Sequence, residues 1–503
     1  MGNVVQVGAR FVTVPIIIQH LGLEGYGIWS VLMSIAAYMS LGGAGVKSAF
    51  QKYAAEATGS GDFERASKLI TTGTAAVLLI STIALVPVAL FSHNLASAAG
   101  VPPSLLGPAS QAILLLAFMS VAMNVGQSYQ AILMGAHRID LQKKLAIASM
   151  ILQSTATIIA LHLGFGLLAM SAIFGCVEIG NSLCCLILSR RIIPAIEIAP
   201  RHLSRSVVRE LAKFGGSYQL VSVLEALYSA ILPVAVLKFY GASAAGVIAL
   251  ASRVVAAALL PQGALLQPVL SGGSFVYASA TPERMRLFAL KSFKATWALS
   301  FVPLAFVGCF GSMMVMAWTG QSAASLPEIL LLLCLGGLFR SFSSVARVLY
   351  RVSGRSLMDN AQLLSMLLIL GCVCAFGKQL GLIGMVAGAV LAQAIGMVLM
   401  WLTLTVIFQG LTVRTLMPQF LRFAAATAAI LAAAALASQI GAPWSASART
   451  LATIRLGAVS LVSMAAAVPA LLLTGSVSWS EARTILDTLS DRVRTKASGV
   501  RAS

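Results

Sequence analysis

Residues 16–29 read IIIQHLGLEGYGIW, two apolar stretches that meet at a short cluster of glycines carrying one acidic residue, Glu24. A similar stretch, KFYGASAAGVIA, recurs at residues 238–249. Glycine reaches backbone conformations with positive φ and allows close approach of neighbouring backbone. Each cluster therefore predicts a tight turn between two apolar helices, and its recurrence predicts a repeated unit.

The composition of the chain places these helices in a membrane. Of the 503 residues, 59% are hydrophobic and only 10% are charged, with a mean hydropathy of +0.93. A soluble domain carries about 25% charged residues, so this chain cannot cover itself with a polar surface in water. Its start, MGNVVQVGAR, has no basic segment and no small-residue cleavage site after it, which predicts a permanent helix rather than a signal peptide.

Apolar runs long enough to span a bilayer, which takes about 20 residues, follow one another along the chain. Most of the 34 Lys and Arg residues fall in the even-numbered connecting loops and the C-terminal tail, which the positive-inside rule places in the cytoplasm. The net charge of +19 is then mainly a topology signal, and we expect no nucleic-acid partner. The fourteen predicted spans lie at residues 4–22, 26–46, 69–92, 108–134, 145–163, 166–188, 214–237, 244–270, 288–318, 326–346, 357–377, 382–408, 419–439 and 452–474.

One sequence offset links several separate loops. The pairs that are 219 positions apart are Gly22 with Gly241, Gly27 with Gly246, Glu64–Arg65 with Glu283–Arg284, and Gly135 and Asp140 with Gly354 and Asp359. Because six helices per unit is an even number, both units enter the membrane from the same side, as a parallel repeat. We predict an all-α integral membrane protein with about 14 transmembrane helices. It comprises six-helix lobes at residues 1–213 and 214–410, and two additional helices with a cytoplasmic tail at 411–503.

Three stretches of the first lobe carry a resemblance to a known family. They are LGLEGYGIW at 21–29, LGGAGVKSAFQKYAAEATGSGDFERA at 41–66 and GAHRIDLQKK at 135–144. In their order and spacing they are similar to motifs of the multidrug/oligosaccharidyl-lipid/polysaccharide (MOP) exporter superfamily, which includes the MATE-like transporters. Within it, the chain most resembles the Wzx-type polysaccharide-biosynthesis flippases.

The resemblance implies a flippase in the bacterial inner membrane. Such proteins move undecaprenyl-pyrophosphate-linked oligosaccharide repeat units of O-antigen (lipopolysaccharide), exopolysaccharide or capsule to the periplasmic leaflet by alternating access. The implied partners are the lipid-linked oligosaccharide, membrane lipids and a polysaccharide polymerase or export machinery, with the chain itself a monomer. No cofactor is implied beyond H⁺ or Na⁺ coupling. A wet cavity is needed because a sugar-pyrophosphate group cannot cross hydrocarbon.

Charged and polar side chains within the spans are the candidates for that cavity. The resemblance implies that helices 1, 2, 7 and 8 line it, so the basic residues there are predicted to bind pyrophosphate or acidic sugars, since arginine grips phosphate bidentately. A polar stripe on helix 4 and an arginine on helix 10 extend the set. The predicted substrate-binding residues are Arg10, Lys47, Arg253, Arg340, Asn124 and Gln127.

Two acidic residues within spans are candidates for ion coupling. Glu225 lies in the middle of a polar stripe on helix 7, and Glu178 lies in helix 6. A buried carboxylate has a raised pKa and a nearby cation lowers it, so either group can bind H⁺ or Na⁺. The structural alternatives are a salt bridge of Glu225 with Arg10 or Arg253, and a hydrogen bond of Glu178 within its own lobe.

Three other functions remain as alternatives. A MATE-type drug antiporter needs a more acidic cavity than this chain offers, and a peptidoglycan-precursor flippase is hard to separate by sequence. A membrane enzyme, such as a polymerase or ligase, needs an acid–base constellation. The chain shows no P-loop, no GxSxG and no paired carboxylates. All seven cysteines lie in apolar runs without a CxxC pair, so we expect neither a disulfide framework nor a zinc site.

Overall fold

The computed structural model describes residues 2–39, 50, 54, 61–136, 138–279, 281–353, 357–407, 413–438 and 448–475, and the regular elements in these ranges are all helical. The helices are α1 (Gly2–Met39), α3 (Phe63–Ala98), α4 (Pro103–Gly135), α5 (Ile139–His162), α6 (Leu167–Ile192), the short 3₁₀ helix η2 (Pro200–His202), α7 (Arg205–Ala258), α8 (Leu260–Ser279), α9 (Pro282–Thr319), α10 (Leu326–Val352), α11 (Leu357–Ala375), α12 (Gly377–Ile407), α13 (Val413–Ser438) and α14 (Ala448–Leu473).

Eleven helices in the described ranges are long and apolar enough to cross a membrane. This number agrees with fourteen predicted spans because α1 and α7 each contain two spans joined at a kink. The remaining predicted span corresponds to α11 (Leu357–Ala375), in which the described apolar segment is Gln362–Ala375. The second segment of α7 continues into α8, so predicted span 244–270 is a bent helix. The predicted all-helical membrane fold is confirmed.

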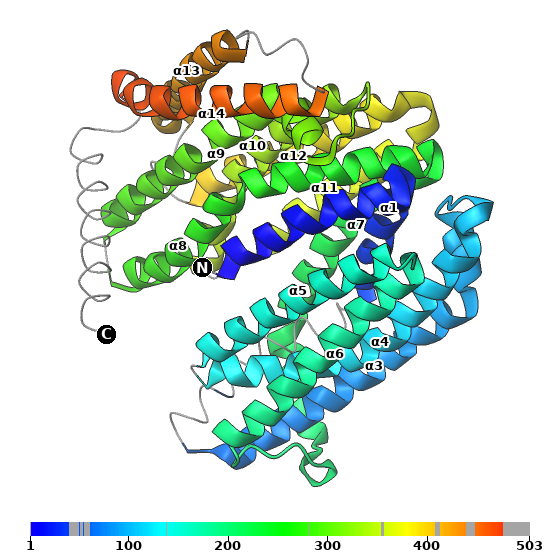
Figure 1. The fold of residues 1–503 in the computed structure, drawn as a ribbon. Helices are drawn as coiled ribbons and strands as arrows, with labels where there is room; N and C mark the ends of the chain where they lie inside the picture. The colour runs from blue at the N-terminus through cyan, green and yellow to red at the C-terminus, as the bar shows by residue number, and fades with distance from the viewer. Residues whose placement is uncertain are drawn as a thin grey trace, which may run out of the picture. The chain divides into compact units, whose positions relative to one another are not determined.

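By its internal contacts the chain forms two compact units, which are described separately. Unit 1 comprises residues 1–253 and 355–396. In it α4 packs between α3 and α6, and α1 lies against α4 and α5. Figure 1 shows α3, α4 and α6 running side by side.

The glycine clusters form the predicted turns. Gly22 breaks α1 with φ 69° and ψ 176°, and Gly241 breaks α7 with φ 84° and ψ 176°. This combination of positive φ and extended ψ is open essentially to glycine alone. The two kinks are also in contact. A Cβ added to Gly27 would lie 2.1 Å from the carbonyl oxygen of Ala242, and one added to Gly246 would lie 2.2 Å from that of Leu23.

Other left-handed glycines confirm the repeat. Gly100 and Gly320, with φ 83° and 72°, are 220 positions apart, and Gly164 and Gly381, with φ 82° and 71°, are 217 positions apart. Helix starts match too, because α3 begins at Phe63 and α9 at Pro282, 219 positions later. In the first copy Asp62 caps α3 by accepting the backbone N–H of Arg65 at 3.1 Å, as N-terminal aspartates do.

Unit 2 comprises residues 254–354 and 397–503. Its α9 packs against α8, α10, α13 and α14, and α13 and α14 lie side by side in Figure 1. The core is aromatic, with Trp297 and Phe293 of α9 fully buried against Phe423 of α13. The two additional helices are thus part of this core rather than an appendage.

The compact units cut the chain at other places than the predicted domains 1–213, 214–410 and 411–503. Helix α7 as far as Arg253 and residues 355–396 belong to unit 1 by contact. The predicted domain boundaries follow the duplication of the sequence, whereas the compact units follow the packing of the helices. The predicted domains therefore stay a prediction.

Candidate functional site

A polar cavity of about 440 Å³ lies within unit 1, between α1, α4, α5, α6 and α7. Its apolar wall is formed mainly by α1, with Val14, Ile17 and Trp29, and by Phe174 of α6. Its polar and charged side chains come from all five helices. They are Thr13, Tyr26, Gln130, Gln142, Gln153, Ser154, Thr157, Glu178, Asn181 and Arg253.

Helix α5 contributes one polar face to this cavity. Gln142, Gln153 and Thr157 are spaced so that they fall on one side of a helix, with Ala146 and Met150 between them. The opposite side of α5 carries the exposed Ile151 and Ile159. The helix therefore presents hydrocarbon outward and amide and hydroxyl groups to the cavity.

Arg253 brings a positive charge to the cavity wall. It lies in the second segment of α7, inside a predicted span, and is partly buried. Among the side chains that the structure describes, it forms neither a hydrogen bond nor a salt bridge, including with the acids Glu225 and Glu178. A cation within a span calls for an anion, so Arg253 makes this cavity suited to an anionic group.

Helix α6 adds an acid and an open acceptor. Glu178 and Asn181 lie about one turn apart on α6, and both line the cavity. The side-chain carbonyl oxygen of Asn181 is buried without a hydrogen-bond partner in the described part of the chain. Buried acceptors normally have a donor or an ion, so this end of the cavity offers oxygen ligands to a proton or a small cation.

The structure brings together only some of the predicted site residues. Arg253 and Glu178 line one cavity, whereas Glu225 is exposed on the first segment of α7 and is not among the lining residues. Arg340 is exposed on α10 of unit 2. Lys47 lies outside the described residues, and of Arg10 only the backbone, within α1, is described. The binding and coupling roles of these residues stay predictions.

The predicted polar stripe of α4 faces in two directions. Asn124 is buried, and its amide nitrogen donates to the backbone oxygen of Met39 at 2.8 Å and to Oγ of Ser81 at 2.9 Å. The amide nitrogen of Asn124 therefore links α4 to α1 and α3 through these two hydrogen bonds. Gln127 is half-buried outside the cavity lining, while Gln130, one turn further on, lines it.

Sequence reasoning missed the residues of α5 and Gln130. A signal existed, since Gln142, Gln153 and Thr157 interrupt an apolar span at spacings that helices place on one face. The predicted stripes on helices 4 and 7 have the same helical spacing, so spacing alone does not distinguish α5 from them. Which stripe faces a cavity depends on how the helices rotate against one another.

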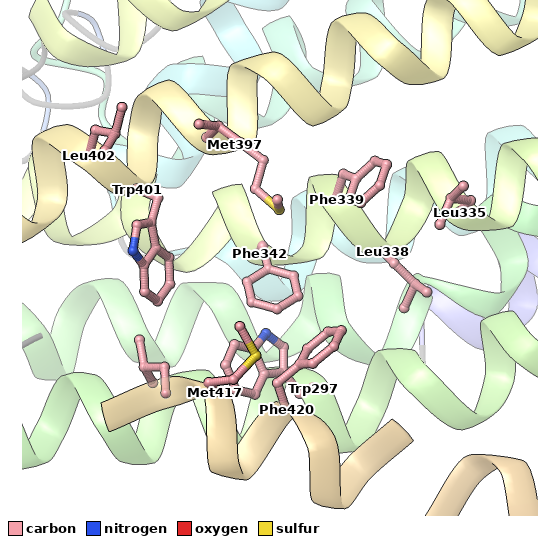
Figure 2. Close-up of a pocket in the computed structure, with 12 residues that line it drawn as sticks. Trp297, Leu335, Leu338, Phe339, Phe342, Met397, Trp401, Leu402, Met417 and Phe420 are labelled. Carbon is pink, nitrogen blue, oxygen red and sulfur yellow. The ribbon is translucent and has the colours of Figure 1, made fainter. Parts of the chain in front are cut away.

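A second cavity, of about 400 Å³, lies within unit 2 and is apolar. Figure 2 shows the rings of Trp297, Phe342 and Phe420 and the side chain of Met417 meeting at its centre. The ring centroids of Trp297 and Phe342 are 4.5 Å apart. Because the described residues that line it are all apolar or aromatic, this cavity fits hydrocarbon and not a sugar. One wall belongs to α13, the first of the two additional helices.

Comparison with known proteins places the fold. Residues 1–174 match the MatE family. No curated protein sequence matches the chain. The chain is similar to an inward-facing multidrug resistance MATE family transporter of the MOP superfamily, with 19% identity over 80% of this chain and 94% of that one and a TM-score of 0.64. It has the fold of the MOP superfamily transporters.

Two further structures refine this likeness. A MOP superfamily transporter from Pyrococcus furiosus, described as having a binding pocket of reverse polarity, shares 15% identity over 81% of this chain and 94% of its own, with a TM-score of 0.60. The lipid II flippase MurJ, in an inward closed conformation, shares 14% identity over 92% of this chain and 96% of its own, with a TM-score of 0.66. Since residues 411–503 make up nearly a fifth of the chain, a coverage of 92% extends into the additional helices.

Proposed function

We propose that this chain is a flippase, not an enzyme, that moves an undecaprenyl-pyrophosphate-linked oligosaccharide from the cytoplasmic to the periplasmic leaflet by alternating access. The observation that carries the proposal is Arg253, a cation on the wall of a polar cavity inside a membrane lobe, without an acidic partner among the described side chains. A guanidinium and a phosphate form paired hydrogen bonds. A pyrophosphate or an acidic sugar would supply Arg253 with the direct anionic partner that it does not have among the described side chains.

The extent of the fold supports a lipid-linked cargo. The similarity to the lipid II flippase covers 92% of this chain, against 80% for the MATE transporter. The additional helix α13 also closes an apolar cavity. We place the protein in the bacterial inner membrane as a monomer with both termini in the cytoplasm, working beside a polysaccharide polymerase or export machinery.

Ion coupling is assigned to the α6 end of the polar cavity. Glu178 can exchange a proton or hold Na⁺ there, and the unpartnered oxygen of Asn181 is a second ligand one turn away. Acidic groups within spans commonly serve such relays. Glu225, on the exposed side of α7, is the alternative coupling group.

A drug antiporter is the second candidate, and two observations favour it. Residues 1–174 match the MatE family, and the cavity holds an acid, Glu178, that can bind an organic cation. The two functions differ in the charge of the cargo. Arg253 favours an anion and Glu178 favours a cation, so the two residues can be tested against each other.

The deciding experiment is a vesicle assay with purified protein and a lipid-pyrophosphate oligosaccharide, scored by exposure of the sugar on the far leaflet. The variants are Arg253→Gln and Glu178→Gln, with Arg284→Gln as the control. Arg284 is an exposed arginine near the start of α9 in unit 2. We expect Arg253→Gln to slow flipping at least tenfold, because one charge-assisted hydrogen bond contributes about 1.5–3 kcal/mol.

Each outcome separates the candidates. Flipping that is lost in Arg253→Gln and kept in Arg284→Gln supports the flippase and the cationic site. If Arg253→Gln flips the lipid at the normal rate, the protein is still a flippase, but Arg253 is not part of its substrate-binding site. If the wild type does not flip the lipid but exchanges an organic cation against H⁺ or Na⁺, with loss in Glu178→Gln, the antiporter is the function.

A further inference from the structure

A third feature lies on the outer surface of unit 1, away from the polar cavity. It is an open apolar groove of about 560 Å³ between α3, α4 and α6. Large apolar side chains on its walls are exposed, among them Leu78 at 48%, Phe118 at 57% and Leu183 at 54%. Its floor is the close contact of α4 with α6, where a Cβ on Gly126 would lie 2.0 Å from Oγ of Ser182.

This groove, which we name the α4–α6 groove, continues into a charged end. A smaller cavity of about 290 Å³ is lined by Tyr129, Ser189 and Arg190, together with the connection that follows α6. Tyr129 lines both cavities. On α6 the apolar lining ends at Leu186, and Ser189 and Arg190 follow within about one turn. The surface is therefore amphiphilic, with one apolar part and one cationic end.

The charge at this end is positive. Arg190 forms no hydrogen bond or salt bridge with the side chains that the structure describes. Glu197 lines the same cavity, but its carboxylate is bonded to Arg201 and lies 3.6 Å from Nε2 of His202. The hydrogen bond from Arg201 lowers the pKa of Glu197, so the carboxylate stays ionised, and Arg201 supplies its counter-charge. Arg190 is left to face an anion.

The length of the groove matches one leaflet of a membrane. Phe118 and Tyr129 are eleven residues apart on α4, which is about 16 Å at 1.5 Å per residue. The hydrocarbon core of a bilayer is about 30 Å thick, so the groove spans about half of it. Arg190 ends α6 on the side of the basic loops, where anionic headgroups attract arginine.

We propose that the α4–α6 groove binds a resident anionic phospholipid. One acyl chain lies between α3, α4 and α6, the phosphate lies at Arg190, and Tyr129 marks the boundary between hydrocarbon and headgroup. A groove of one-leaflet length suits a lipid that stays in its leaflet. The site is thus separate from the cargo cavity and does not rest on the proposed function.

The test is native mass spectrometry of the full-length protein with added phosphatidylglycerol or phosphatidylcholine. Wild type is expected to retain phosphatidylglycerol in preference to phosphatidylcholine. Arg190→Gln should reduce retention about tenfold, since a charge-assisted hydrogen bond is lost. Arg191→Gln is the matched control, because the neighbouring arginine is also exposed but does not line the cavity. Ala122 is an exposed residue that lines the groove. Ala122→Trp should block the acyl chain and reduce retention of phosphatidylglycerol, although Arg190 is unchanged in this variant.

Several results would overturn the site. Equal retention in Arg190→Gln and wild type, or equal losses in Arg190→Gln and Arg191→Gln, would show general surface attraction. Unchanged retention of phosphatidylglycerol in Ala122→Trp would show that the acyl chain does not lie in the groove. Displacement of the phospholipid by millimolar inorganic phosphate would show a free-anion site, and preferential displacement by a polyprenyl pyrophosphate would show a cargo site.

Discussion

At the scale of single residues, two glycines join the halves of the repeat. Gly27 and Gly246 occupy equivalent sequence positions, and each lies against the backbone near the other kink. Neither has a positive φ, so the requirement for glycine is one of space. At Gly22 and Gly241 the requirement is conformational, since open space surrounds both.

The first prediction concerns space. Gly27→Ala places a Cβ 2.1 Å from the carbonyl oxygen of Ala242, so the backbones must separate. Overpacking of this kind costs about 1–3 kcal/mol, and we expect a lower melting temperature in detergent. Gly457→Ala is the control, because nothing lies within 4 Å of that helical glycine and alanine favours a helix. Equal melting of Gly27→Ala and wild type would disprove the contact.

The second prediction concerns conformation. Asparagine tolerates the left-handed helical region, which Gly320 adopts at φ 72° and ψ 6°. It does not tolerate φ 84° and ψ 176°, the conformation of Gly241. Gly241→Asn should therefore destabilise the protein by about 1–3 kcal/mol, and Gly320→Asn should be nearly neutral. Thermal unfolding of the two variants checks this, and a reversed order would contradict the assigned kink.

At the scale of elements, a row of hydroxyl groups on α3 holds the connection between α6 and α7. The backbone N–H of Glu197 donates to Oγ of Ser67 at 3.0 Å, and that of Ser204 donates to Oγ1 of Thr72 at 3.0 Å. The hydroxyl of Thr71 donates to the carbonyl oxygen of Glu197 at 3.3 Å. These bonds fix an otherwise irregular segment that lines the smaller cavity at Arg190.

Thr72→Val removes the acceptor for the Ser204 amide. Leaving that N–H without its partner costs about 1 kcal/mol, so we expect the Ser204 amide to exchange hydrogen about fivefold faster. Thr74→Val is the control on the same helix, because its hydroxyl is buried without a partner among the described residues. Faster exchange in both variants, or in neither, would count against the tether.

At the scale of the whole molecule, the distribution of basic residues predicts the topology. Three helices, α4, α5 and α6, separate the start of α4 from the connection after α6. An odd number of crossings would put these two places on opposite sides of the membrane, and we expect the more basic one in the cytoplasm.

A labelling experiment tests this topology. In a chain whose seven native cysteines are replaced by alanine, single cysteines are introduced as Ser104→Cys and Leu203→Cys, both at exposed positions. In intact cells a membrane-impermeant maleimide should label the first and spare the second. Labelling of both on disruption of the cells confirms access, and labelling of both in intact cells would refute the three crossings.

The sequence by itself determined the membrane class, the spans and the repeat, because hydropathy, glycine and charge are local properties that act within one helix or turn. Gly22 and Gly241 are recognisable without any tertiary information. Only the tertiary structure decided which polar groups meet. Glu178, Arg253 and the glutamines of α5 are far apart in the chain, and their common cavity depends on how each helix is rotated. In lipid both faces of a helix are apolar, so hydropathy leaves that rotation open and packing fixes it.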